Sequence, residues 1–157
     1  MGWIVEGVAH LRGRPFERLA VAVPTDGQVV RVPLVKLTFD DDGWWLPRLR
    51  EIGAPGLVLE AMGGGHVPSW LCDDLAALAA TIPILVTSRT GNGEVLRSTY
   101  GGFPGSETWL IEAGLIPAGS LDSLKARILL GVLLTSGADR AGIEAAVETL
   151  GSPARGS

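Results

Sequence analysis

Cysteine, lysine and long apolar runs are scarce in this 157-residue sequence. The single cysteine, Cys72, cannot form a disulfide within the chain, so we expect a protein of the reducing cytoplasm. Lysine occurs only at Lys36 and Lys125, and the arginines form no long basic cluster. Because binding of phosphates requires a basic face and the net charge is −4, we do not expect nucleic acid as a partner.

The longest apolar stretch in a helical pattern, residues 126–134, contains Arg127 and is far too short to span a bilayer. The opening residues, MGWIVEGVAHLRGRP, have neither the apolar core nor the cleavage site of a signal peptide. We therefore expect neither a membrane partner nor a secretory leader. A hydrophobic content of 46% with 19% charged residues instead fits one globular domain with a substantial core.

The motifs of common cofactor and nucleophile sites are also absent. The sequence has no GxGxxG, no phosphate loop ending in GKS or GKT, and no GxSxG. The two histidines, His10 and His66, are far in sequence from each other and from the cysteine, so we predict no metal and no cofactor. We expect His10 and the arginines that follow it to form an ordinary solvated surface.

From residue 30 onward, strand-like apolar runs alternate with helical patterns at short intervals, which favours a parallel sheet with right-handed crossovers. We predict a small doubly wound (Rossmann-like) α/β domain over residues 30–151, with a short parallel four-stranded sheet flanked by helices. Residues 1–29 are interpreted as a connecting segment or edge ribbon, and residues 152–157 as a disordered tail. The predicted strands cover 30–39, 56–62, 83–87 and 115–118, and the predicted helices 45–52, 69–81, 107–113, 120–136 and 140–150.

The sequence GLVLEAMGGGHVP, residues 56–68, joins the second predicted strand to the next helix. A glycine turn between a strand and a helix is the usual ligand-facing edge of an α/β sheet. The glycines, among them Gly64 and Gly65, let the backbone approach a ligand or a neighbouring subunit closely. His66 is the polar residue of this loop, and its local sequence leaves a structural hydrogen bond and a functional contact equally open.

Three other polar segments have both a structural and a functional interpretation. Residues 40–42 are three aspartates, which suit Mg²⁺ but more often form a turn and a helix N-cap. Glu107 begins a predicted short helix, where a carboxylate usually complements the helix dipole. Residues 125–127, KAR, interrupt an apolar helix and are typical of a solvated side or an ion pair. That helix carries a stripe of Leu121, Leu124, Ile128 and Val132.

Four segments together resemble the C-terminal domain of bacterial-type L-asparaginases of the asparaginase/glutaminase family. They are residues 56–68, residues 83–89 (PILVTSR), residues 99–101 (TYG) with Glu107, and residues 119–127 (GSLDSLKAR). The resemblance extends over residues 30–150. It implies hydrolysis of L-asparagine to L-aspartate and ammonia by a threonine nucleophile, in an active site shared between neighbouring subunits.

In that family the C-terminal domain contributes two groups to the partner's site, and the resemblance assigns them to His66 and Glu107. Glu107 matches because it lies eighteen residues before Lys125, the lysine of the KAR triplet. His66 stands where asparagine is more common, and Gly64 stands where another asparagine often occurs. The family's TGGT-like and DGTDT-like threonine segments, which belong to its N-terminal domain, are absent from this sequence.

We therefore interpret the chain as a C-terminal domain of an asparaginase-like amidohydrolase without the N-terminal catalytic domain. We expect no catalytic residue in it and no activity of the chain alone, because a catalytic group fails without its nucleophile. Its expected roles are oligomer contacts and completion of a partner's site through His66, Glu107, Gly64 and Gly65. The expected partners are further copies of the chain, a separate N-terminal asparaginase half, and a small amino acid such as asparagine. The alternative is a regulatory module that binds a small amino acid or carboxylate at the glycine loop.

Overall fold

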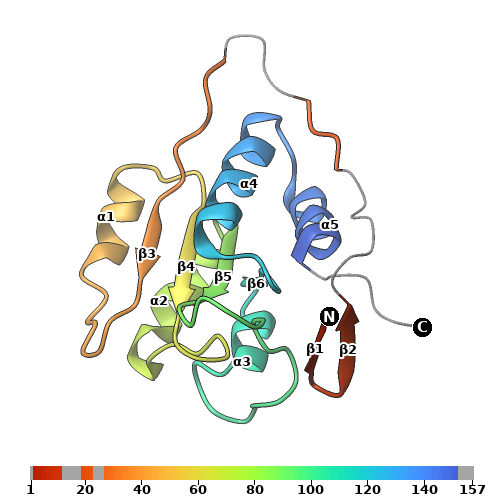
Figure 1. Cartoon of the computed structure of the whole chain (residues 1–157). Helices are drawn as coiled ribbons and strands as arrows, with labels where there is room; N and C mark the ends of the chain where they lie inside the picture. The colour runs from red at the N-terminus through yellow and green to blue at the C-terminus, as the bar shows by residue number, and fades with distance from the viewer. Residues whose placement is uncertain (1, 12–18, 23–26, 152–157) are drawn as a thin grey trace.

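A computed structural model describes residues 2–11, 19–22 and 27–151, and its centre is a parallel sheet (Figure 1). The strand order is β3-β4-β5-β6, which is also the chain order. The strands are β3 (Leu34–Lys36), β4 (Leu57–Ala61), β5 (Ile84–Ser88) and β6 (Ile116–Pro117). All three neighbouring pairs are parallel. The predicted α/β class with a four-stranded parallel sheet is confirmed.

Two apolar layers cover the sheet because alternate residues of each strand point to opposite faces. Leu57 and Leu59 of β4 belong to one buried cluster, and Val58 belongs to the other. The first layer is formed by α1 (Trp45–Glu51), the short 3₁₀ turn η1 (Ser69–Leu71), α2 (Cys72–Ala79) and α3 (Glu107–Glu112). The second is formed by α4 (Ser123–Thr135) and α5 (Arg140–Gly151).

The core-facing side of α4 differs from the predicted stripe. Leu124 and Ile128 are 67% and 65% exposed, whereas Ala126 and Leu130 are fully buried. The helix is apolar on several sides, so the spacing of leucines alone does not identify its buried face. The first predicted strand was also too long, since only its middle residues pair with β4.

Residues 2–11 form an antiparallel hairpin of their own, β1 (Gly2–Val5) and β2 (Val8–Leu11). The expectation of a solvated His10 was wrong: its side chain is buried, with Nδ1 3.1 Å from Oε1 of Glu94. The arginines that follow His10, at positions 12, 14 and 18, and the predicted disordered tail at residues 152–157 lie outside the described residues. Within the described ranges, no helix is long and apolar enough to cross a membrane.

A polar cluster joins two strands to α4. Glu60 of β4 is buried, and its carboxylate oxygens lie 2.7 Å from Nζ of Lys36 and 2.6 Å from Oγ of Ser123. Burial raises the pKa of Glu60, but the hydrogen bonds from Lys36 and Ser123 and the lysine charge outweigh it and hold the pKa below its ordinary value. The carboxylate therefore stabilises the fold in its charged form.

This cluster predicts a pH-dependent stability. A lowered pKa in the folded state means that the stabilisation is present above the unfolded-state pKa near 4.5 and is lost as the pH falls through the folded-state pKa. We expect Glu60→Gln to lower the free energy of unfolding by about 1–3 kcal/mol at pH 7, and by less below about pH 4.5. Urea unfolding at several pH values measures this difference. Glu51→Gln, at an exposed ion pair on α1, is the control and should change stability by less than about 0.5 kcal/mol. A loss for Glu60→Gln that is the same at pH 7 and pH 4 would contradict the assignment.

Candidate functional site

The candidate site lies at the carboxyl end of the sheet, where β4 leads into the glycine turn. His66 pairs with Met62 across this turn, since each backbone N–H donates to the other residue's carbonyl, at 2.8 and 2.9 Å. The hydroxyl of Ser88, the last residue of β5, donates to the carbonyl of Gly63. The turn is therefore tied to both central strands, and His66 occupies a defined position at their ends.

The glycines of the turn allow close packing against residues 95 and 96. A Cβ on Gly64 would lie 2.7 Å from Cδ1 of Leu96, and a Cβ on Gly65 would lie 2.6 Å from Cγ1 of Val95. Leu96 also donates its N–H to the carbonyl of Gly64 at 2.8 Å. The close approach predicted for these glycines is therefore satisfied inside the chain by Val95 and Leu96. Contact of Gly64 and Gly65 with a partner's site stays a prediction.

His66 and Glu107, which are 41 residues apart, meet at this edge. Nε2 of His66 lies 2.8 Å from Oε2 of Glu107. In the tautomer with the proton on Nε2, the imidazole donates to this carboxylate, and Nδ1 is the ring nitrogen that remains for a further partner. The second oxygen of Glu107 accepts the backbone N–H of Tyr100. Both carboxylate oxygens are thus occupied within the chain.

The two side chains of the pair differ strongly in exposure. The side chain of Glu107 is 1% exposed and that of His66 is 30% exposed. Glu107 is the first residue of α3, and Ser106 caps this helix by accepting the N–H of Trp109. The prediction that Glu107 opens a short helix is therefore confirmed. Its carboxylate lies in the first turn of α3, as expected, and in addition contacts His66 and Tyr100.

Two aromatic rings surround the imidazole. The rings of Tyr100 and Phe103 meet His66 edge-on, with centroids 5.1 and 5.9 Å away. Both aromatic residues are about half exposed, and both belong to the irregular segment between β5 and α3. Sequence reasoning identified the TYG segment only through the family resemblance and assigned Phe103 no role. The sequence feature that could have identified Phe103 is a pair of aromatic residues in a glycine-rich loop directly before Glu107.

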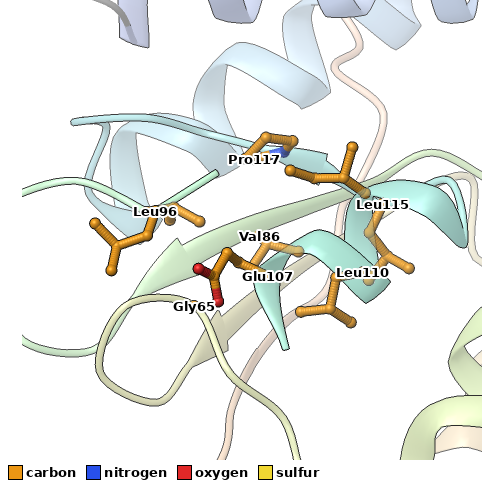
Figure 2. A pocket seen from close by; sticks show the side chains of 9 residues that line it. Gly65, Val86, Leu96, Glu107, Leu110, Leu115 and Pro117 are labelled. Atoms are coloured by element: carbon orange, nitrogen blue, oxygen red, sulfur yellow. The ribbon is translucent and has the colours of Figure 1, made fainter. Parts of the chain in front are cut away.

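A small cavity lies behind Glu107, between the turn and α3 (Figure 2). Its volume is about 10 Å³, which is at the lower limit for one water molecule. Apart from Glu107 the side chains around it are apolar, and they include Val86, Leu110 and Leu115. This cavity has no room for an amino acid.

The other polar candidates do not join this site. Asp41 accepts the N–H of Gly43 and the indole N–H of Trp45, so residues 40–42 form a turn. The expected N-cap is wrong, because no side chain caps α1. Among the described residues, no group of three or more potential ligands could hold a metal ion. Lys125 forms an ion pair with Asp122 at 2.8 Å, as expected for a solvated helix side.

The site is therefore the polar edge of an α/β domain, a histidine backed by a buried carboxylate. Comparison with known proteins gives the family: residues 31–147 match the model of the Glutaminase/Asparaginase C-terminal domain. The chain belongs to this family, as the sequence resemblance indicated.

Two curated relatives agree with this assignment. The chain is 46% identical over 88 residues to a probable L-asparaginase of Deinococcus radiodurans, covering 55% of the chain and 26% of that protein. It is 38% identical over 106 residues to an L-asparaginase of Bacillus licheniformis, covering 67% of the chain and 32% of that protein. The matched part thus spans about a third or less of the length of either relative.

The glycine turn provides a matched pair of substitutions. Gly63 and Gly65 both have positive φ, at 51° and 114°, but only Gly65 is crowded by Val95. We expect Gly63→Ala to lower the free energy of unfolding by about 1 kcal/mol, and Gly65→Ala to lower it by more than about 2 kcal/mol. Urea denaturation of the two variants measures the difference. Equal losses would show that Val95 does not constrain the turn.

Proposed function

We propose that this chain completes an amide-hydrolase site by presenting His66 to an amino-acid substrate whose amide is attacked by a nucleophile from another polypeptide segment. The observation that carries the proposal is the His66–Glu107 pair, a partly exposed imidazole held by a buried carboxylate at the carboxyl end of the sheet. The names of both relatives suggest L-asparagine as the substrate, with L-aspartate and ammonia as products.

The geometry supports different roles for the two residues. Glu107 is 1% exposed and both its oxygens accept hydrogen bonds within the chain, so His66 is the group that meets the substrate. Glu107 orients the imidazole, fixes the proton on Nε2, and leaves Nδ1 for the substrate or for a group that binds it. Such fixed orientation lowers the entropic cost of reaching the reactive geometry. In this assignment Glu107 does not bind the α-ammonium group of the substrate directly.

The chain alone is proposed to be inactive, because its role is to orient a substrate and not to attack it. The first arm of the test incubates the purified 157-residue chain with L-asparagine and with L-glutamine. Ammonia release at enzyme-like rates would overturn the inactivity. The same substrates and their acids in calorimetry test the alternative role, a regulatory binding module, which would bind one of them without any second polypeptide.

The second arm supplies the missing segment. We expect ammonia release when the chain is co-expressed with the remaining part of the Bacillus licheniformis relative, and a loss of at least about 10-fold in kcat/KM for His66→Ala. Glu51→Gln, on α1 and away from the site, is the control that should retain full activity. Equal activity of the wild type and His66→Ala would exclude the assigned role of His66.

Self-association is a further part of the proposal, and α4 is the surface we propose for it. Leu124 and Ile128 lie one helical turn apart and are both about two-thirds exposed, so they form an apolar strip on this helix. A second copy of the chain would bury that strip. We expect Ile128→Asp to lower the mass measured by sedimentation equilibrium, with Glu51→Gln as the control. A monomeric wild type would exclude this contact.

A further inference from the structure

We propose that Glu6, at the tip of the β1–β2 hairpin, is a positioning residue that holds residues 97–99 and through them sets the Glu107–His66 pair. The carboxylate of Glu6 accepts hydrogen bonds from the backbone N–H groups of Arg97 and Ser98 and from the hydroxyls of Ser98 and Thr99, at 2.7–3.3 Å. The functional meaning of this role rests on the function proposed above.

The segment that Glu6 binds contacts the site at both of its ends. On one side, Leu96 donates its N–H to the carbonyl of Gly64 and packs on that glycine. On the other side, the N–H of Tyr100 donates to Glu107, and the Tyr100 ring meets His66. Glu6 binds the three residues between these two contacts. A shift of residues 97–99 would therefore move both the glycine turn and the donor that holds Glu107.

Burial in the core does little to hold this segment. Ser98, Thr99 and Tyr100 are all exposed, and the residues around them form no helix or strand. Exposed irregular backbone opens easily unless specific bonds restrain it. Among the described residues, Arg97 also pairs with Glu148 at 2.8 Å, which holds one of the three residues, whereas the Glu6 carboxylate, itself exposed, accepts hydrogen bonds from all three. Glu6 is thus the main polar restraint on residues 97–99.

Glu6 occupies a position that glutamate does not favour. It is the first of the two turn residues of the hairpin and has a φ of 49°, followed by Gly7 with a φ of 77°. Two-residue turns with positive φ at both positions prefer asparagine, aspartate or glycine at the first. The side chain of glutamate is longer than those of asparagine and aspartate, and its carboxylate reaches residues 97–99. The backbone strain is thus offset by the bonds that its side chain makes.

The charge state of Glu6 agrees with this arrangement. Burial raises the pKa of Glu6, but hydrogen bonds from Thr99, Ser98 and Arg97 outweigh it and hold the pKa below its ordinary value. The carboxylate is therefore ionised at neutral pH and accepts all of these bonds. Charged acceptors make the stronger class of hydrogen bond, which suits a single side chain that orders an exposed segment.

Glu6→Asn distinguishes the role of residue 6 in the hairpin turn from its contact with residues 97–99. Asn-Gly is a favoured two-residue turn, so the hairpin is kept, but the shorter, neutral side chain loses the hydrogen bonds to residues 97–99. We expect amide hydrogen exchange of Tyr100 to accelerate about 10-fold in the 157-residue chain. We also expect an Nε2 proton resonance of His66 in the wild type, protected by Glu107, and its loss from NMR spectra of the variant. The Ile4–Ala9 pairing of the hairpin should persist. Glu51→Gln is the control and should change neither signal.

Thr99→Val tests the same link from the other side, since it removes one donor to Glu6 and leaves the hairpin sequence unaltered. It should move the Tyr100 and His66 signals in the same direction as Glu6→Asn, but by less. Should Glu6→Asn disrupt the hairpin, Thr99→Val decides the question. Unchanged Tyr100 exchange and an unchanged His66 signal in Thr99→Val, or in a Glu6→Asn variant with an intact hairpin, would overturn the proposal.

These signals are read in the chain alone, so the outcome does not depend on amide hydrolysis. Suppose that the Tyr100 and His66 signals change in these variants, while the chain co-expressed with the remaining part of the relative keeps its activity after His66→Ala. The positioning role of Glu6 then stands and the proposed function fails. If the complemented enzyme requires His66 but neither signal responds to loss of the Glu6 contacts, the function stands and the role of Glu6 fails.

Discussion

Burial of the Glu107 carboxylate is the constraint on which the candidate site depends. The carboxylate of Glu107 is 1% exposed, and burying a polar group is costly unless it finds hydrogen-bond donors. The donors come from two segments that are remote from each other, the imidazole of His66 after β4 and the backbone of Tyr100 before α3. Satisfying one buried charge therefore brings the glycine turn, the irregular segment and the start of α3 together.

The glycine turn provides the backbone geometry that the contact between His66 and Glu107 requires. His66 can point to Glu107 only if the chain reverses within a few residues after β4, and the positive φ of Gly63 and Gly65 permits this reversal. Val95 and Leu96 then occupy the space that side chains at Gly65 and Gly64 would need. Gly63 thus serves the chain reversal, and Gly64 and Gly65 also serve close packing within the chain.

The regular part of the fold was predictable because its signals are local. Short apolar runs between glycines and prolines identified β4 and β5, and the 3.6-residue spacing identified α2. The face of α4 was not predictable, since ILLGVLL is apolar on nearly every side and only the sheet beneath it selects Ala126 and Leu130. For residues 1–29 a connecting segment or edge ribbon was expected, but the hairpin turn was not located, because glutamate is an unfavourable first turn residue and Glu6-Gly7 carries a weak turn signal.

Of the candidate site, the identity of the two residues could be predicted, but their contact could not. The glycine turn indicated His66 as a candidate, and the spacing from Lys125 in the family resemblance indicated Glu107. No local pattern relates two side chains that are 41 positions apart, since their meeting depends on the sheet order and on the path of the intervening loop. The burial of His10 against Glu94 has the same origin, a contact between the hairpin and that loop.

The contact between His66 and Glu107 changes the chemistry that the edge can perform. A freely exposed glutamate would hold a cation directly, whereas this glutamate has given both oxygens to groups of its own chain. Of the two side chains, the imidazole is the one with exposed surface, and it is flanked by two partly exposed aromatic rings. A histidine oriented in this way contributes a directed polar contact and not a nucleophile. Under the function proposed above, the attacking group would come from a second surface that closes over this edge.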